Sequence, residues 1–506
     1  MKEAAPLNIR RIFHQSLHSG LFFVLNYGSR LLLAIALGKA LSVQEYGIYS
    51  LIGMVVATST SLFPLGVTQY YVREIPGVPL RSAMKIFKSV IGIQMVFLLA
   101  AIASVLAIPA LREPFNRWLG IGGLPMFALL VAGLLIGENL AADFGRFLFF
   151  RGEIQRGNVV SFLQYGLWAY AAFALFLFAP HAMTLKNVLL LWTLSLAAAA
   201  LYGFFRVGPR ALWEAPIEPG IYRTALRFGF PLLTASTLAV ANTVGRFVLA
   251  NSHSAHLVGI FTYQFNIVLM IGAISAPLIG NPIDPYAIEA YNVGHTERCR
   301  YLLGASLRYR MALVIPFLIV ASIWSEPLIR LLAKREYMAG GWLLASLTPL
   351  PLLAILGNTF ERVLFLERRT GTIGRCYLIA AAVQIGITFW LVPQHPYKGM
   401  VLASLAGGGG LTGMLWYHAR KTKMAVDTAL GRLLPSTVCA LAVACAAAKL
   451  LPGGRPFNVL AAATLIVCAA YALFAYLYRV LSQSEIKKLK DLIGRQMQGV
   501  AVERSS

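Results

Sequence analysis

Apolar stretches of about 20 residues recur along nearly the whole of this 506-residue sequence, with short polar connections between them. A helix needs roughly 20 mainly apolar residues to cross the hydrocarbon core of a bilayer, so each stretch is long enough to span a membrane. The composition agrees, because 58% of the residues are hydrophobic and only 13% are charged. The pattern predicts an all-α polytopic membrane protein with about fourteen transmembrane helices and no soluble domain of useful size.

The distribution of Lys and Arg predicts how these spans are oriented. The predicted spans cover residues 17–38, 47–71, 86–110, 122–143, 157–179, 184–205, 228–250, 256–280, 303–323, 341–361, 375–393, 398–418, 433–450 and 456–478. Roughly three quarters of the Lys and Arg residues lie in the N-terminal segment, in every second loop and in the C-terminal tail. This asymmetry predicts an even number of spans in the inner membrane, with both termini in the cytoplasm.

Two further features narrow the class of protein. The cytoplasmic loops account for the net charge of +24, so the charge gives no reason to expect a nucleic-acid partner. The five cysteines show no CxxC spacing and lie in predicted spans or on the cytoplasmic side, so disulfides and metal sites are not expected. The first stretch, 17–38, is longer than the core of a signal peptide, and we expect it to remain as an uncleaved span.

The sequence repeats itself after the sixth predicted span. The paired segments are Asn26-Tyr-Gly-Ser-Arg30 with Asn242-Thr-Val-Gly-Arg246, Tyr46-Gly-Ile-Tyr49 with Val258-Gly-Ile-Phe261, and Pro64-Leu-Gly66 with Pro277-Leu-Ile-Gly280. Because spans one and seven are six apart, both begin on the cytoplasmic side, which predicts a parallel repeat about an axis along the membrane normal. We therefore expect two six-helix lobes at 1–205 and 228–425, joined by a cytoplasmic linker at 206–227. Residues 426–506 would form an accessory pair of spans and a basic cytoplasmic tail.

Four short segments contain specific residues, in a fixed order along the chain, that hydropathy alone does not require. They are Leu37–Tyr49 after the first span, Phe228–Pro231 entering the seventh, Arg246 with Val258–Ile260, and Arg335–Tyr337 before the tenth. Together they resemble the polysaccharide-type, Wzx-like flippases of the multidrug/oligosaccharidyl-lipid/polysaccharide exporter (MOP) superfamily, over roughly residues 15 to 420. The resemblance implies two bundles around a central cavity that opens alternately inward and outward. Many relatives carry Asp immediately before the arginine of span seven, where this chain has Gly245.

Two arginines inside predicted spans are the main candidates for binding cargo. Arg30 lies about ten residues from the cytoplasmic end of span one, or roughly 15 Å, which places it near the midplane. An arginine there is costly unless it faces a wet cavity or a partner, and its planar fork suits phosphate oxygens. Asn26 is one turn away, and Arg246 with Asn242 is the repeat equivalent. The alternatives are a helix-pinning ion pair for Arg30 and snorkelling to the interface for Arg246.

Neutral polar residues on spans two and eight are further candidates. Gln69, Gln264 and Asn266, with the run Thr58–Ser61, could bond to sugar hydroxyls in the cavity. Hydroxyl side chains equally often bond to carbonyls of their own helix. Pro64 and Pro277 occupy matching sites and could act as hinges, or simply as fixed kinks.

Acidic residues on span four are candidates for ion coupling. Glu138 and Asp143 could couple transport to a proton or a sodium ion, and the membrane potential is a further driving force. Asp143 also lies three residues before Arg146, so a structural ion pair on one helix face is the competing interpretation. No cofactor and no catalytic residue are predicted.

The function predicted from these features is that of a flippase. It would carry a polyprenyl-pyrophosphate-linked oligosaccharide from the cytoplasmic to the outer face of the inner membrane, for surface polysaccharide such as O-antigen in the cell envelope. Expected partners are the lipid-linked sugar, membrane lipids, and the polymerase and chain-length proteins of the same pathway. A lipid II flippase is the alternative, and a drug exporter is disfavoured because the deep charges are arginines. A membrane-embedded polymerase or glycosyltransferase is disfavoured by the short external loops and the lack of a DxD motif.

Overall fold

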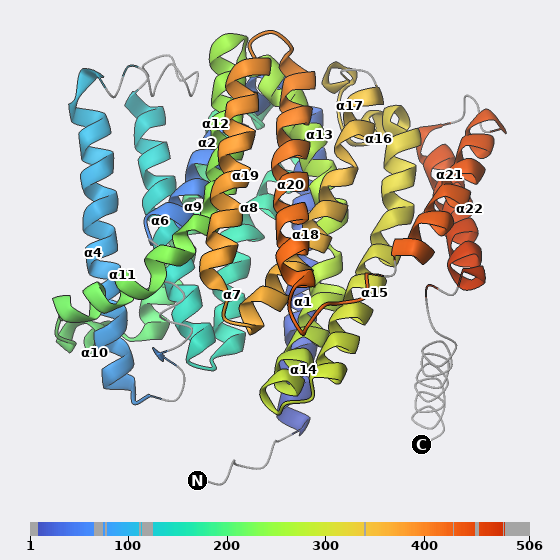
Figure 1. Cartoon of the computed structure of the whole chain (residues 1–506). Helices are drawn as coiled ribbons and strands as arrows, with labels where there is room; N and C mark the ends of the chain where they lie inside the picture. Colours follow the sequence, from blue (N-terminus) through green and yellow to red (C-terminus); the bar gives the residue numbers. More distant parts are fainter. Residues whose placement is uncertain are drawn as a thin grey trace, which may run out of the picture. The chain divides into compact units, whose positions relative to one another are not determined.

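The protein is described here from a computed structural model covering residues 9–64, 74–75, 78–110, 113, 125–338, 341–428, 430–450, 455–478 and 480. Within these ranges every regular element is a helix (Figure 1). Eleven helical segments of the described chain are long and apolar enough to cross a membrane. The predicted all-α polytopic class is therefore confirmed.

The helices follow one another in this order along the chain. They are α1 (Ile9–Ala40), α2 (Val43–Leu62), α4 (Leu80–Ala107), α6 (Pro125–Phe150), α7 (Ile154–Tyr165), α8 (Leu167–Phe178), η1 (Pro180–Ala182), α9 (Leu185–Val207), α10 (Pro209–Glu214), α11 (Pro219–Leu233), η2 (Thr234–Ser236), α12 (Thr237–Ser252), α13 (Ala255–Ala273), η3 (Ala276–Gly280), α14 (Asn281–Asn292), α15 (Thr296–Ile323), α16 (Ser325–Leu332), η4 (Arg335–Tyr337), α17 (Gly341–Leu347), α18 (Pro349–Leu366), α19 (Thr370–Leu391), α20 (Pro396–Arg420), α21 (Leu430–Leu450) and α22 (Pro456–Leu477).

Each predicted span overlaps a helix, but several do so in a form that hydropathy alone does not show, and three of these carry candidate residues. Span 17–38 is part of the longer α1, and span 47–71 is helical only as far as Leu62 within the described residues. Span 228–250 is divided into the end of α11, the 3₁₀ turn η2 and α12. These are the polar spans that carry Arg30, the Thr58–Ser61 run and Arg246.

The chain forms two compact units. The first comprises Met1–Phe265, Leu332–Ala339 and Arg369–Leu411, and the second comprises Asn266–Leu331, Gly340–Arg368 and Thr412–Ser506. These units are defined by contacts and do not follow the boundaries of the predicted lobes, which rest on the sequence repeat. The lobes remain a prediction, and each unit is described separately.

In the first unit, the N-terminal helices pack around α6 and α7. Helix α6 lies against α7 and α9, α1 lies against α7 and α8, and α12 lies against α19 and α2. The start of α2 is set locally by a capping box, in which the Ser42 hydroxyl accepts from the Glu45 amide and the Glu45 carboxylate accepts from the Ser42 amide. The helix therefore begins at Val43, within the Leu37–Tyr49 segment that carries the family resemblance.

In the second unit, α15 is the central helix. It contacts α14, α17, α18, α21 and α22. The last two helices, predicted as an accessory pair, pack against each other as well as on α15. Small residues such as Ala440, Ala444 and Ala463 are buried in this pair, which lets the two backbones approach closely.

Candidate functional site

Arg30 is an exposed arginine in the middle of α1. Its guanidinium lies 5.6 Å from the ring centre of Tyr27 and 5.9 Å from that of Tyr165 on α7. Among the described residues, no carboxylate forms an ion pair with it. The described residues therefore do not provide the ion pair between helices that the sequence offered as an alternative for Arg30. The hydrogen-bond donors of the Arg30 guanidinium remain available to a ligand.

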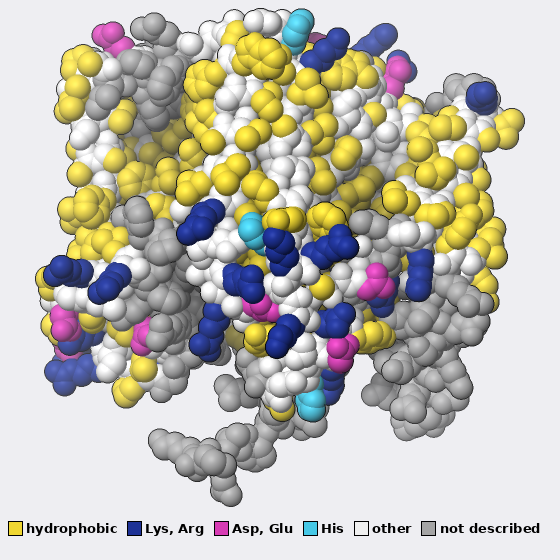
Figure 2. All heavy atoms as spheres, in the orientation of Figure 1, with side chains coloured by type: hydrophobic (Ala, Val, Ile, Leu, Met, Phe, Trp, Pro, Cys, Tyr) yellow, Lys and Arg dark blue, Asp and Glu magenta, His cyan; other side chains and the backbone are white. Residues whose placement is uncertain are grey.

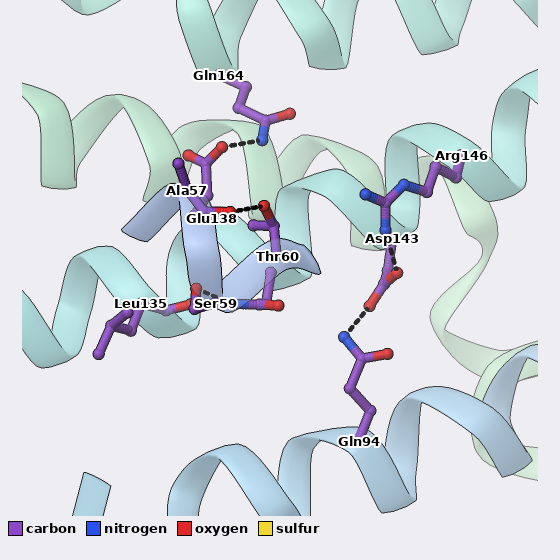
Figure 3. A network of polar contacts seen from close by, with 10 residues as sticks. Ala57, Ser59, Thr60, Gln94, Leu135, Glu138, Asp143, Arg146 and Gln164 are labelled. Carbon is purple, nitrogen blue, oxygen red and sulfur yellow. Dashed lines mark hydrogen bonds and ion pairs between the residues drawn. The ribbon is translucent and has the colours of Figure 1, made fainter. Parts of the chain in front are cut away.

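The buried carboxylate of Glu138 links α6 to α7, and it shares the neighbour Tyr165 with Arg30. Gln164 donates from Nε2 to Glu138 Oε1 at 2.8 Å, and the Tyr165 hydroxyl is close enough to interact with the same carboxylate. Glu138 Oε2 has no hydrogen-bond partner among the described residues. Figure 3 shows the side chains of Glu138 and Gln164 pointing toward each other across the α6–α7 contact. A buried carboxylate with a free oxygen can take up a proton or a cation.

The neighbouring residue Asn139 extends this polar group to α2. It donates from Nδ2 to the Ser59 hydroxyl at 3.0 Å and to the Leu135 carbonyl at 2.8 Å. On the other face of α2, the hydroxyls of Thr58 and Thr243 lie 2.8 Å apart and connect α2 to α12. Ser59, Thr60 and Ser61 donate to carbonyls of their own helix, as the competing interpretation proposed, and the run also forms contacts between helices.

Asp143 lies in a separate, fully paired arrangement. Its carboxylate accepts from Gln94 Nε2 of α4 at 2.9 Å and from Arg146 Nη1 at 3.2 Å (Figure 3). The predicted pairing of Asp143 with Arg146 is confirmed. Because both oxygens of this carboxylate are already bonded, Glu138 is the better placed of the two candidates for ion coupling.

Arg246, the repeat equivalent of Arg30, lies in a different environment. It is 1% exposed and donates to the Thr262 hydroxyl at 3.1 Å and the Asn242 carbonyl at 3.0 Å. The guanidinium also lies 4.7 Å from the ring centre of Phe265, and Nη2 has no hydrogen-bond partner among the described residues. Arg246 therefore neither snorkels nor faces an open space in this conformation.

Each of the two asparagines of the repeat bonds to a neighbouring helix. Asn26 of α1 donates to the Ser161 hydroxyl of α7 at 3.5 Å, and Asn242 of α12 accepts from Gln384 of α19 at 2.9 Å. The two contacts differ in direction and in the type of partner, and the parallel repeat stays a prediction.

The other neutral candidates are not gathered around the arginines. Gln264 is buried and donates to the Tyr337 carbonyl at 3.0 Å, while Asn266 is half-buried on α13 and belongs to the second unit. Gln69 lies outside the described residues. Pro64 is buried in the turn that follows α2, and the backbone at Pro277 forms the π-helical turn η3. A π-helical turn is a local irregularity of the kind found at hinges.

Gly245, where many relatives have Asp, faces α19 and α20. A methyl group at this position would lie 3.3 Å from Met400 Cε and 3.7 Å from the Thr388 hydroxyl oxygen. That hydroxyl is buried and has no hydrogen-bond partner among the described residues. A carboxylate at position 245 would therefore point at an unsatisfied hydroxyl once Met400 moved aside.

An apolar cavity of about 290 Å³ lies in the first unit. Its walls come from α2, α4, α6 and α12, and the only polar side chains in its lining are those of Thr58, Ser59 and Thr243. Neither Arg30 nor Arg246 lines it. The cavity touches the Asn139–Ser59 contact, and so reaches the edge of the Glu138 group described above.

A group of residues that sequence reasoning did not single out joins the segment 332–339 to the connection between α1 and α2. We call this segment the latch. Tyr263 donates from its hydroxyl to the Ala34 and Leu332 carbonyls, each at 3.1 Å, and its ring lies 4.7 Å from that of Tyr337. Lys39 donates to the Ala333 carbonyl at 2.9 Å, and Lys334 donates to the Ala40 carbonyl at 2.9 Å.

The latch explains why distant segments carry one family pattern. Tyr46 from the Leu37–Tyr49 segment and Tyr337 from the Arg335–Tyr337 segment have ring centres 5.7 Å apart. Both segments were recognised in the sequence as part of the resemblance, but nothing in the sequence indicated that they contact each other.

Comparison with known proteins supports the fold. No known protein family profile and no curated protein sequence matches the chain. The lipid II flippase MurJ in an inward closed conformation matches at a TM-score of 0.70 with 14% identity, over 92% of this chain and 99% of that one. An inward-facing multidrug-resistance MATE transporter of the MOP superfamily matches at 0.59 with 15% identity, over 79% and 96%. A MOP superfamily transporter from Pyrococcus furiosus matches at 0.52 with 14% identity, over 81% and 96%. The chain therefore has the fold of the MOP superfamily transporters.

Proposed function

We propose that this protein is a flippase that moves a polyprenyl-pyrophosphate-linked oligosaccharide from the cytoplasmic to the outer face of the inner membrane. The observation that carries the proposal is Arg30, an exposed arginine within the predicted first span that has no carboxylate partner among the described residues. A charge at such a depth is retained when water or an anionic ligand meets it. The pyrophosphate of a lipid-linked sugar supplies that anion.

The surroundings of Arg30 suit a headgroup of this kind. Tyr27 and Tyr165 hold the plane of the guanidinium while its nitrogens remain free, and a guanidinium binds two phosphate oxygens at once. Asn26 lies one turn away and provides neutral hydrogen-bonding groups for a sugar. The lipid tail would stay in the bilayer while the headgroup crosses.

The second arginine would act in another conformation. Phe261 and Phe265 enclose Arg246, so it can contact the pyrophosphate only in a state in which these rings have moved. Its unsatisfied Nη2 atom is consistent with a partner that arrives during the cycle. Asn242, Gln264, Asn266 and Gln69 would contribute in the same way. The bends at Pro64 and Pro277 are proposed to let the helices rock between inward- and outward-open states.

We assign the coupling of transport to a proton or sodium ion to Glu138. Asp143, which pairs with Arg146, is the second candidate. The free Oε2 atom of Glu138 is the basis of this assignment, since it can receive a proton or sodium ion close to Arg30. The membrane potential is the other driving force. We place both termini in the cytoplasm from the asymmetry of Lys and Arg, and expect the polymerase and chain-length proteins of the pathway as partners.

A lipid II flippase is the second candidate, because the lipid II flippase MurJ has a similar fold. That protein shares the fold over nearly its whole length, whereas its sequence is 14% identical. Both cargoes carry a lipid-linked pyrophosphate, so Arg30 would have the same role in either case. The two cargoes therefore differ in the saccharide attached to the pyrophosphate.

The test is deletion of the gene in its host, followed by analysis of lipid-linked sugars on each face of the inner membrane. Oligosaccharide precursor accumulating on the cytoplasmic face, rescued by wild type and not by Arg30→Ala, is the expected result. Arg455→Ala is the matched control, because it removes an exposed arginine at the start of α22. Accumulation of lipid II would favour the second candidate. Completed but unpolymerised units on the outer face would overturn flipping in favour of polymerisation.

A further inference from the structure

The connection between α9 and α12 contains an amphipathic corner that the transport function does not use. The chain leaves α9 at Val207, reverses at Gly208 with φ +100°, runs through α10 and enters α11. We call residues 205–227 the elbow. In Figure 1, α10 and α11 run across the end of α4 rather than along it, and both contact α4.

Side chains from the first turns of α4 hold the elbow in place. Lys88 donates to the Trp213 carbonyl at 2.8 Å and to the Ala215 carbonyl at 2.7 Å. The Glu218 amide donates to the Ser89 hydroxyl at 2.8 Å, and the Glu218 carboxylate pairs with Lys85. Because α4 and α9 are both long enough to cross a membrane and the elbow lies at their ends, it lies at the level of the lipid headgroups.

The outer surface of the elbow is strongly apolar for a segment at the end of a span. Trp213 is 84% exposed and Ile217 is 55% exposed, and Phe205, in the last turn of α9, is 67% exposed. The inner surface is already filled by buried Ala215, Tyr222 and Ala225. Tryptophan at the headgroup level is typical of an interfacial anchor, because the indole has an apolar body and a polar N–H.

Exposed cations surround these apolar side chains. They are Arg206, Arg210, Arg223 and Arg227. Arg210 pairs with Glu214, whereas Arg223 and Arg227 lie one helical turn apart on the outward face of α11 and form no ion pair among the described residues. On the face shown in Figure 2, Lys and Arg side chains gather over α10 and α11, and hydrophobic side chains cover α4 beyond them.

We propose that the elbow is a binding site for anionic phospholipid, in which Trp213 and Ile217 enter the headgroup layer and Arg223 and Arg227 contact lipid phosphates. Amphipathic segments with cations beside Trp and aliphatic residues bind anionic bilayers through this combination of burial and charge. Each Lys or Arg near such a surface favours binding by roughly fivefold. The proposal needs only the fold and the elbow, so it stands or falls independently of the cargo.

The test uses the full chain reconstituted in vesicles that contain brominated lipid, which quenches nearby tryptophan. The Trp213 signal is taken as the difference between wild type and Trp213→Phe. Brominated phosphatidylglycerol should quench it at a several-fold lower mole fraction than brominated phosphatidylcholine. Trp390→Phe gives the control signal, because Trp390 is 68% exposed on α19 within a span and should be quenched equally by both lipids.

The variant Arg223→Gln/Arg227→Gln tests the role of the cations. It should abolish most of the preference for phosphatidylglycerol, roughly 25-fold if both arginines act at full strength, whereas Arg455→Gln should leave it unchanged. Equal quenching of Trp213 by the two lipids would overturn the proposal. So would removal of the preference by millimolar inorganic phosphate, which would identify a free anion as the ligand. Wild-type unfolding temperature in the double variant excludes misfolding as the cause.

Discussion

Gly47 and Gly259 face each other where α2 crosses α13, and their contact is symmetric. A methyl group on Gly47 would lie 1.8 Å from the Ala255 carbonyl oxygen, and one on Gly259 would lie 2.1 Å from the Val43 carbonyl oxygen. Each glycine therefore meets the residue four positions before the other. Gly47 and Gly259 are also equivalent in the sequence repeat. A reciprocal contact between equivalent residues is what a twofold relation between repeats produces.

Substitution of either glycine should disrupt this crossing. Gly47→Ala places a methyl group against backbone, which cannot move aside as a side chain can, so we expect a loss of at least about 1–3 kcal/mol in stability. The measurement is thermal unfolding of the purified protein. Gly92→Ala and Gly386→Ala are matched controls, since nothing lies within 4 Å of the added methyl group, and they should be neutral or slightly stabilising. An unchanged melting temperature for Gly47→Ala would mean that the helices do not cross here.

The two repeat-related arginines should respond in opposite ways to the same substitution. Arg30→Gln should abolish flipping and change stability by less than about 0.5 kcal/mol, because the side chain is exposed. Arg246→Gln should lower stability by about 2–4 kcal/mol, because it removes buried bonds to Thr262 and Asn242. Unfolding curves and a flipping assay on both variants provide the comparison. Equal destabilisation by the two substitutions would contradict the assignment of Arg30 to the cargo.

The latch should depend on the Tyr263 hydroxyl. Tyr263→Phe keeps the ring contact with Tyr337 but removes the bonds to the Ala34 and Leu332 carbonyls, and should lower stability by about 0.5–1.5 kcal/mol. Tyr476→Phe, at an exposed tyrosine on α22, is the control and should have no effect. Chemical denaturation of both variants measures the difference. A neutral Tyr263→Phe would show that the latch is held by the rings and lysines alone.

The role of Glu138 can be separated from that of Asp143 by isosteric amides. Glu138→Gln preserves an acceptor for Gln164, so it should leave stability nearly unchanged while removing the dependence of transport on pH. The charged or titratable groups near this site are Tyr165, Arg30 and Arg146, and each remains in the variant. The measurement is transport across the membrane of vesicles that contain the protein, over a range of pH. A pH profile identical to that of wild type would exclude Glu138 as the group that couples transport to a proton.

Asp143→Asn should behave differently from Glu138→Gln. It removes the negative charge that pairs with Arg146 and weakens the bond from Gln94, so we expect a loss of about 1–2 kcal/mol in stability. The dependence of transport on pH should remain. Thermal unfolding in parallel with the transport assay distinguishes the two residues, and a loss of pH dependence here would make Asp143 the coupling group instead.

Hydropathy was sufficient to predict the all-α polytopic class, because the bilayer imposes one length and one secondary structure on any segment that crosses it. The repeat predicted equivalent places for Asn26 and Asn242, and it stays a prediction, since Asn26 donates to Ser161 whereas Asn242 accepts from Gln384. The pairing of Asp143 with Arg146 was also visible, because residues three apart lie on one helix face. These predictions are local, or depend on a period along one helix.

What the sequence alone determined is therefore the all-α polytopic class and the approximate positions of the apolar helices. Only the tertiary structure decided that Arg30 is exposed while its equivalent Arg246 is buried, and that Gln264 bonds to the latch rather than lining a cavity. The burial of a side chain depends on which helices lie next to it. Matching sequence motifs specify the same residues, but the environment of each is set by neighbours from distant parts of the chain.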